Sequence, residues 1–384
     1  MIYLDNAATS FHKPDCVARA VVEAMQQAGN SGRGSSGEAM EASRIIFDTR
    51  CKIAQLFDVE GPECVAFTAN ATEALNTALF GTLHPEREKV HAICTEMDHN
   101  SVLRPLYALE KRGMDLTILP ADGKGRISVD DLEAAIRPET KAIVCTHASN
   151  LTGNCNDIRS IGAIARKHGI LFIVDAAQTA GVFPISMKKD QIDILCFSGH
   201  KGLMGPQGTG AICVRPGVLV EPLKVGGSGI LTFQKEHPSD MPESLEAGTL
   251  NSHGIAGLRA SLEWIQETGI HTIRKREQML MWRFYDQVKK IPGVTVYGDF
   301  SQEDRSPVVS LNLEGEGSAE VGMILGEDYG ISVRSGGHCA PLMHKALGTE
   351  KTGAVRFSFS YFNTEEEIDA AAAALGELAA GIED

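Results

Sequence analysis

The central part of the chain alternates short apolar runs with stretches of helical periodicity. Apolar runs of strand length cover 142–146, 170–175, 193–198 and 209–214, and a helical pattern from about Asp157 to His168 lies between the first two. Continuous apolar strands that alternate with helices are typical of a mostly parallel sheet covered on both faces. The pattern therefore predicts a doubly wound α/β domain.

The pattern changes after about Gly254. Helical stretches at 255–267 and 270–290 are followed by strand patterns at 294–297, 308–313, 331–334 and 355–359. A last helix is predicted from about Thr364 to Ala380, because Thr364 and Glu367 have the spacing of a capping box. This order indicates a smaller α+β domain. We expect residues 15–253 to form the large domain, and residues 1–14 together with 254–384 to form the small one.

Composition and charge narrow the class of protein. The chain has 384 residues, of which 43% are hydrophobic and 22% charged, and this excludes a disordered protein. Its net charge of −14 argues against nucleic acid or an anionic membrane surface as the main partner. We see no apolar run of about 20 residues and no signal peptide. The nine cysteines form no Cys-x-x-Cys pair, so we expect reduced thiols and a cytoplasmic location.

An aspartate and a lysine on neighbouring strands carry the first candidate chemistry. Asp175 ends the clearest strand, and open α/β sheets bind ligands at the carboxyl ends of their strands. Lys201 lies in the glycine-rich loop that follows the next strand. Alone, each is as well explained as a strand-end turn residue or a surface charge. Together they fit a Schiff-base lysine and a carboxylate that keeps a pyridine nitrogen protonated, and so predict a pyridoxal phosphate site.

The segment 68–76 is a candidate phosphate cradle. It places the small residues Asn70, Ala71 and Thr72 just before a predicted helix, where free backbone N–H groups and the helix dipole favour an anion. Taken by itself, the same segment is better explained as a plain helix N-cap by Asn70 or Thr72.

A series of short motifs resembles the class V aminotransferase-fold enzymes, and among them the cysteine desulfurases and selenocysteine lyases. The motifs are YLDNAAT from residue 3, DHNS from 98, DAAQ from 175, SGHK from 198, RSGGHCA from 334 and RFSFS from 356. They extend from residue 3 to about residue 370 when the last helix is included. The resemblance implies the fold of type I pyridoxal phosphate-dependent transferases, with a large cofactor-binding domain and a smaller α+β domain that carries the cysteine loop.

The resemblance also implies a role for each residue around the cofactor ring. Lys201 would form the imine with pyridoxal 5'-phosphate, and Asp175 would face the pyridine nitrogen. Gln178 would face the ring hydroxyl. His99 would stack on the ring and take part in proton transfer, and Asn150 would lie near the ring and the substrate.

Further residues are implied at the phosphate and in a second subunit. The residues expected to hold the phosphate are Ala71, Thr72, Ser198 and His200. Thr249 would reach the phosphate of the neighbouring subunit, so the resemblance implies a homodimer with shared active sites.

The expected reaction involves Arg356 and Cys339. Arg356 would bind the substrate carboxylate through a bidentate pair. Cys339 lies in a Gly-Gly-His-Cys loop, where a thiol can be exposed and neighbouring cations favour its thiolate, whereas the other cysteines read as small buried hydrophobes. As nucleophile, Cys339 would take sulfur from L-cysteine, release L-alanine and pass its persulfide to an acceptor. Because the cysteine loop is short, we expect a dedicated sulfur-acceptor protein.

Several alternatives remain open at this point. The substrate could be L-selenocysteine, or the enzyme could be another class V lyase or aminotransferase that does not use Cys339. A sulfur carrier without catalysis is disfavoured by the joint presence of Lys201, Asp175, His99 and Arg356. Ser36 stands where the family often has a histidine, and Asn70-Ala71 where its phosphate loop often has Gly-Thr. We expect no metal, because His338, Cys339 and His344 have no fourth partner.

Overall fold

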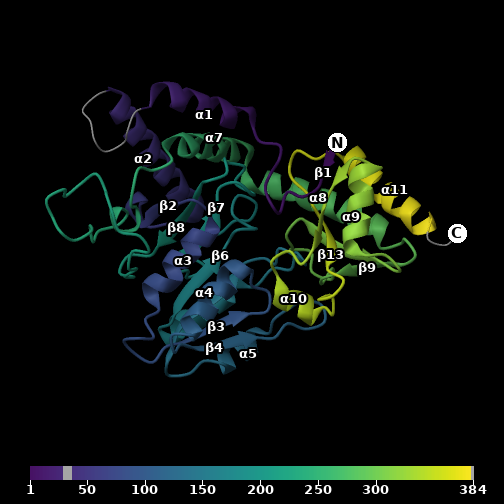
Figure 1. Ribbon diagram of the computed structural model, residues 1–384, viewed down its shortest axis with the longest axis horizontal. Helices are drawn as coiled ribbons and strands as arrows, with labels where there is room; N and C mark the ends of the chain where they lie inside the picture. The colour runs from purple at the N-terminus through teal and green to yellow at the C-terminus, as the bar shows by residue number, and fades with distance from the viewer. Residues whose placement is uncertain (29–36, 382–384) are drawn as a thin grey trace.

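The computed structural model describes residues 1–28 and 37–381, so Ser36 and its departure from the family pattern lie outside the described residues. A seven-stranded sheet has the strand order β2-β8-β7-β6-β5-β3-β4 (Figure 1). Its strands are β2 (Val65–Thr68), β3 (His91–Thr95), β4 (Asp115–Leu119), β5 (Thr140–Thr146), β6 (Leu171–Asp175), β7 (Ile194–Ser198) and β8 (Gly210–Val214). The strands predicted at 142–146, 170–175, 193–198 and 209–214 are therefore confirmed.

The sheet is parallel except for one strand, β8, which lies next to the edge strand β2. Strands β4, β3, β5, β6 and β7 run parallel, while β8 runs antiparallel to both β7 and β2. The connection 199–209 between β7 and β8 contains no helix, and a parallel return would need a longer crossover. The prediction of a mostly parallel sheet is confirmed, with the antiparallel direction of β8 as an addition.

Helices cover both faces of this sheet. They are α1 (Asp15–Gln27), α2 (Gly37–Phe57), α3 (Ala71–Thr82), α4 (Asn100–Glu110), α5 (Val129–Ala134), α6 (Ile158–His168) and α7 (Ser252–Thr268), with short 3-10 turns η1 (Pro62–Cys64) and η2 (Glu243–Leu245). In β6, Phe172 and Val174 pack with α2, α6 and α7, whereas Ile173 packs with α3 and α4 on the other face. Successive strand side chains point to opposite faces, so a strand that is apolar throughout requires both layers.

The C-terminal part forms a second, smaller layer. An antiparallel sheet has the order β12-β13-β10-β9, and β1 pairs in parallel with β11. These strands are β1 (Ile2–Tyr3), β9 (Val294–Tyr297), β10 (Val308–Leu313), β11 (Ile331–Ser332), β12 (Arg334–Gly336) and β13 (Ala354–Ser358). The helices are α8 (Ile270–Val288), α9 (Ser318–Glu327), α10 (Pro341–Ala346) and α11 (Glu365–Gly381).

The prediction of one strand over 331–334 is wrong. Ile331 and Ser332 pair with the N-terminal β1, whereas Arg334 pairs with Arg356 in the antiparallel sheet. The chain changes partner between the two strands, and β12 leads directly into the cysteine loop.

Two clusters of buried apolar residues bear on the domain division. Leu258 and Leu262 of α7 pack with the large sheet, and α1 lies along α7 (Figure 1). Leu280 and Phe284 of α8 instead pack with the small sheet, together with Leu4 from the N-terminus. The division between residues 253 and 254 stays a prediction, and this packing favours a later boundary within α8.

Candidate active site

Most of the residues predicted around the cofactor line a single cavity at the carboxyl ends of β5, β6 and β7. The cavity has a volume of ≈ 260 Å³. The predicted residues that line it are Ala71, Thr72, His99, Asn150, Asp175, Gln178, Ser198, His200 and Lys201. Three other predicted residues, Thr249, Cys339 and Arg356, are not part of its lining. The topology explains the gathering, because the loops after neighbouring parallel strands open at the same edge of the sheet.

Asp175 and Lys201 form the electrostatic centre of this cavity. Burial raises the pKa of the Asp175 carboxyl, while a hydrogen bond from Ala177 N–H at 2.9 Å and the charge of Lys201 act in the opposite direction. Burial lowers the pKa of the Lys201 ammonium to about 8, with Arg356 and Arg334 acting in the same direction and Asp175 against it. A lysine with a lowered pKa has a larger neutral fraction near pH 7, which suits an amine that forms imines.

The N-terminus of α3 lines the cavity. Asn70 caps the helix, because its Oδ1 accepts a hydrogen bond from Glu73 N–H at 3.0 Å. Ser198 Oγ accepts one from Ala71 N–H at 2.9 Å. The two interpretations of this segment are therefore compatible, since Asn70 serves as the N-cap while Ala71 and Thr72 face the cavity.

His200 lines the same cavity as Ala71, Thr72 and Ser198. Its Nδ1 lies 3.0 Å from Thr9 Oγ1. Burial, followed by the charges of Lys201 and Lys13, lowers the pKa of the His200 imidazole to about 4. The ring is therefore neutral at pH 7 and can offer a hydrogen bond without adding a further charge.

His99 is the N-cap of α4, and its hydrogen bonds define its protonation state. Its Nδ1 accepts a hydrogen bond from Ser101 N–H at 3.0 Å and lies 2.9 Å from Ser101 Oγ. Burial and the charges of Lys201, Arg334 and Arg356 lower the pKa of the His99 imidazole to about 4. A backbone N–H can only donate, so we infer that the neutral ring carries its proton on Nε2.

This state of His99 narrows its expected role in proton transfer. A protonated Nε2 can donate a proton or a hydrogen bond but cannot accept a proton. Lys201 and His99 are two groups in this cavity that could remove a proton from the substrate α-carbon, and this geometry favours the Lys201 amine.

Asp98 is a residue of the site that sequence reasoning passed over. It is fully buried, and its Oδ1 accepts a hydrogen bond from Thr146 N–H at 2.7 Å, while Oδ2 accepts bonds from Thr95 N–H at 2.7 Å and Thr95 Oγ1 at 2.9 Å. It thus ties the end of β3 to the end of β5 and fixes the start of α4, where His99 lies. The only signal in the sequence was its place in the motif DHNS.

The N-terminal segment also belongs to the site. Gln178 Nε2 donates a hydrogen bond to Ala7 O at 3.1 Å, and His200 O accepts one from Ser10 N–H at 3.0 Å. Asn6 Nδ2 donates to Ser358 O at 3.0 Å, which joins the same segment to β13. The motif YLDNAAT therefore connects the lysine loop with the small sheet.

Arg356 is buried beside the lysine cavity and already has partners. Its Nη2 forms an ion pair with Asp5 Oδ1 at 2.7 Å, and its Nη1 donates to Asn150 O at 3.0 Å. Its Nε is buried without a partner among the residues that the structure describes. Because Nε is itself buried, a bidentate grip on a substrate carboxylate would require Asp5 to share or release Nη2.

Cys339 lies in a second hollow, of ≈ 520 Å³, that is lined by Arg334, His338 and Asn100 among others. The thiol-bearing residue is exposed. His338 and Cys339 have φ values of 49° and 55°, a left-handed conformation that costs such residues about 1–3 kcal/mol each. Hydrogen bonds hold the loop in this state, since Cys339 O accepts from Asn100 N–H at 2.9 Å and His338 O from Asn150 Nδ2 at 2.8 Å.

The side chains of His338 and His344 support the cysteine loop from within. His338 Nε2 donates to Arg334 O at 3.0 Å, and its Nδ1 lies 3.5 Å from His344 Nε2. Nδ1 of His344 lies 2.7 Å from Thr349 Oγ1. Within residues 1–28 and 37–381 the structure gathers no cluster of three or more potential metal ligands.

Thr249 lies away from the lysine cavity. It is exposed and lines a third hollow, of ≈ 380 Å³, together with Arg50, Glu246 and residues 227–230. Within one chain the structure does not bring Thr249 to Lys201. In the same described ranges, no helix is long and apolar enough to cross a lipid bilayer.

Fold and site together define an α/β protein with a half-buried lysine and a buried aspartate at the carboxyl edge of its sheet, and a cysteine on a strained loop nearby. Comparison with known families agrees with this description. The chain belongs to the class-V aminotransferase family, which matches residues 2–371.

Individual relatives cover nearly the whole chain. It is 34% identical to a probable cysteine desulfurase of Methanothermobacter thermautotrophicus, over 98% of this chain and 94% of the relative. The apo structure of a cysteine desulfurase from Thermococcus onnurineus NA1 is similar, with a TM-score of 0.92 and 33% identity over 99% of this chain and 95% of the other. The cysteine desulfurase CsdA of Escherichia coli gives a TM-score of 0.85 and 30% identity over 99% and 94%.

Proposed function

We propose that this protein is a pyridoxal phosphate-dependent cysteine desulfurase that converts L-cysteine to L-alanine and leaves a persulfide on Cys339. One observation carries the proposal: Lys201 and Asp175 line the same cavity, and an exposed cysteine lies in a second hollow, whose loop accepts a hydrogen bond from Asn150 of that cavity. The desulfurase names of the relatives support the same activity.

The residues of the lysine cavity fit the proposed cofactor. Lys201 would hold its aldehyde, Asp175 would pair with the ring nitrogen, and the start of α3 with Thr72, Ser198 and His200 would bind the phosphate. When bound, pyridoxal phosphate withdraws electrons from the substrate α-carbon.

The chain's own residues would divide the remaining work. Arg356 binds the substrate carboxylate once Asp5 shares or releases its Nη2, and the Lys201 amine accepts the α-proton. The Cys339 thiolate forms a bond to the substrate sulfur while the substrate's carbon–sulfur bond breaks. The electron pair of the broken bond stays with the carbon that becomes the methyl group of alanine. The sulfur thereby remains on Cys339 as a persulfide, ready for exchange with an acceptor thiol.

The test of this proposal is the product. With L-cysteine we expect alanine and one persulfide per active site, whereas a keto acid with ammonia would point to a transaminase or a β-eliminating lyase. Replacing Cys339 with Ser should lower alanine formation on the order of 10³-fold or more, because the nucleophile is lost. Replacing Lys201 with Ala should abolish the visible absorption band of the lysine imine. Wild-type rates in Cys339→Ser would remove the thiol from the reaction.

Selenocysteine is the second candidate substrate, and the position of Cys339 favours testing it. The Cys339 hollow is separate from the lysine cavity, and the carbon–selenium bond is weaker than the carbon–sulfur bond. Selenium release could therefore proceed without the thiol. Cys339→Ser should then retain activity on L-selenocysteine but lose activity on L-cysteine.

We further propose a homodimer, a dedicated sulfur-acceptor protein and a cytoplasmic location. Exposed apolar side chains support the dimer, among them Met40 and Phe47 of α2 and Phe233 in the long loop after β8. The short strained cysteine loop supports an acceptor that comes to the thiol. All nine cysteines are free, which supports a reducing compartment.

A further inference from the structure

A tight turn after β5 carries Asn150. This residue contacts both the cysteine loop and Arg356, which lie outside the lysine cavity. Ser149 N–H donates to Asn154 O at 2.9 Å, and Gly153 N–H donates to Ser149 O at 3.0 Å. Asn150 binds the cysteine loop through its side chain, at His338 O, and Arg356 through its own carbonyl. The position of this turn therefore sets where the cysteine loop lies relative to the cavity.

Consecutive carbonyl groups of the turn, those of residues 150–153, accept hydrogen bonds from the C-terminal part of the chain. In order, the donors are Arg356 Nη1 at 3.0 Å, Ser310 Oγ at 2.5 Å, Arg305 Nη2 and Ser306 N–H at 2.8 Å. All four donor residues are at most 1% exposed. A buried carbonyl without a partner costs about 1–3 kcal/mol, so the turn must follow these donors.

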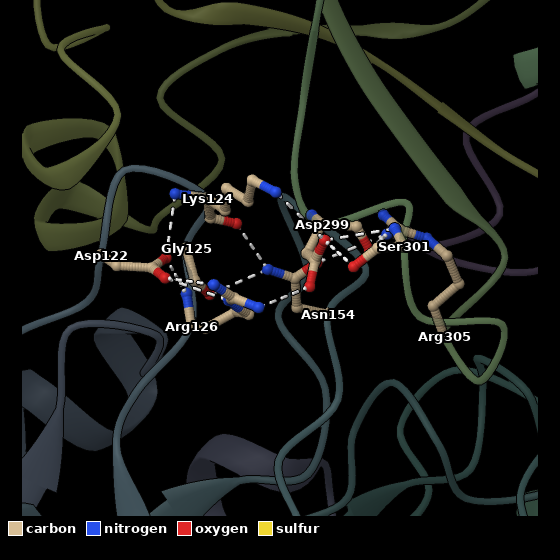
Figure 2. A network of polar contacts seen from close by, with 8 residues as sticks. All are labelled: Asp122, Lys124, Gly125, Arg126, Asn154, Asp299, Ser301 and Arg305. Atoms are coloured by element: carbon tan, nitrogen blue, oxygen red, sulfur yellow. Dashed lines mark hydrogen bonds and ion pairs between the residues drawn. The ribbon is translucent and has the colours of Figure 1, made fainter.

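Figure 2 shows the polar cluster that fixes the far end of the turn. Asn154 Nδ2 donates to Lys124 O at 2.8 Å and Gly125 O at 2.9 Å, while its Oδ1 accepts from Asp299 N–H at 2.9 Å and Arg305 Nη1 at 3.4 Å. One amide side chain therefore joins the loop after β4, the turn and the segment before β10.

Arg305 is the central group of this cluster. Its Nη1 also donates to Asp299 O, and its guanidinium carbon lies 3.6 Å from the centre of the Phe300 ring. The Asp299 carboxylate accepts from Ser301 Oγ at 2.6 Å and pairs with Arg126 Nη1 at 3.1 Å. The forked guanidinium thus holds two backbone carbonyls, at 152 and 299, in one fixed arrangement.

Apolar contacts extend this arrangement to the cysteine loop. Leu151 of the turn packs in one buried cluster with Ala340, which directly follows Cys339, with Met343 of α10, and with Met97, which precedes Asp98 and His99. A shift of the turn would therefore move the cysteine loop relative to the start of α4.

We propose that Arg305 and Ser310 are positioning residues, which act through the turn 150–153 and Asn150 to hold the cysteine loop where its thiol can reach the substrate sulfur. Neither residue lines the lysine cavity or the Cys339 hollow. The expected effect on kcat rests on the proposed desulfurase activity. The expected effect on the position of the cysteine loop does not depend on that activity.

The main test compares Ser310→Ala with Ser261→Ala in the full-length holoenzyme. Ser261 is an equally buried serine whose Oγ donates to a backbone carbonyl, Leu258 O at 2.9 Å, in α7. We expect Ser310→Ala to lower kcat for L-cysteine roughly 10- to 100-fold, with a smaller change in KM, because a displacement near 1 Å is that costly. The visible absorption of the bound cofactor should stay as in wild type, and Ser261→Ala should match wild type throughout.

A second measurement needs neither cofactor nor turnover. Amide hydrogen exchange at residues 337–340 should be faster in Ser310→Ala than in Ser261→Ala, and the rate of Cys339 alkylation should change with it. Arg305→Lys keeps the charge but cannot donate to the carbonyls of residues 152 and 299 at the same time. It should therefore change exchange at residues 337–340 and Cys339 alkylation more than Ser310→Ala does.

The outcomes separate the two proposals. If Ser310→Ala and Arg305→Lys both match Ser261→Ala in exchange and in kcat, the positioning role is wrong. If exchange at 337–340 rises while wild-type protein forms no persulfide, the positioning role stands and the desulfurase proposal fails.

Discussion

At the scale of single residues, Glu277 is a buried carboxyl group that lines neither the lysine cavity nor the Cys339 hollow. It is 2% exposed, its Oε1 accepts a hydrogen bond from Tyr361 N–H at 3.0 Å, and its Oε2 has no partner among the described residues. Burial raises the pKa of the Glu277 carboxyl to about 8, so the folded protein holds it as a neutral acid at pH 7.

This state of Glu277 predicts a pH dependence of stability. Between the unfolded pKa near 4.5 and the folded pKa of about 8, the native state binds more protons than the unfolded state, so Glu277 lowers stability as the pH rises. Glu277→Gln removes this dependence. In urea unfolding, the stability gained by the variant should therefore increase from pH 5 to pH 8. A constant difference across that range would contradict a neutral Glu277.

The protonation of His99 gives a second prediction at this scale. Because its pKa is lowered to about 4, His99 should remain a neutral ring with its proton on Nε2 from pH 5.5 to pH 8. Nitrogen-15 spectra of histidine-labelled protein measure this state directly, and the His99 signal can be assigned from its loss in His99→Gln. Titration of that signal near pH 6.5 would show that burial does not lower the pKa of the His99 ring.

At the scale of helices and strands, local sequence patterns correctly predicted the elements whose formation depends on the periodicity of nearby apolar residues. The helices over 158–168 and 270–288 and the strands over 294–297 and 308–313 follow from apolar periodicity. The failures concern long-range partners. The separation of β11 from β12 depends on β1 and β13, and these partners lie outside any window of ten residues around positions 331–336.

The capping box of α11 is a prediction of this kind that the structure confirms. Glu367 N–H donates to Thr364 Oγ1 at 3.2 Å, and Thr364 N–H donates to Glu367 Oε2 at 3.1 Å. Thr364→Ala should therefore lower the free energy of unfolding by about 1 kcal/mol. Thr272→Ala, at an exposed position inside α8, should change it by less than about 0.5 kcal/mol. Equal effects of both variants in urea titrations would argue against the cap.

At the scale of the whole molecule, the site was predictable where neighbouring strand ends meet and not where separate parts of the chain meet. Asp175, Ser198 and Lys201 follow from the rule on strand ends and from the family motifs. The pairing of Asp5 with Arg356 and the hold of residues 305–310 on the turn join segments more than 150 residues apart, and no spacing in the sequence indicates them.

The proposed dimer gives the prediction at this scale. Phe47 of α2 is 57% exposed, so Phe47→Glu should weaken association if this face meets a second copy. Since Thr249 would then no longer reach the partner's cofactor, the dissociation constant for pyridoxal phosphate should rise by roughly 10-fold, the worth of one hydrogen bond to a charged group. Met323→Glu, at an exposed position of α9, should remain dimeric. Sedimentation velocity and absorbance titration measure both effects, and a dimeric Phe47→Glu would exclude this face.

The join between Asn6 and Ser358 bears on how the protein matures. Residues separated by 352 positions complete the wall that covers the lysine loop. During synthesis, the first ten residues leave the ribosome long before their partners exist, and they must wait for nearly the entire polypeptide. We therefore expect pyridoxal phosphate to bind late, after the ribosome has released the nascent chain.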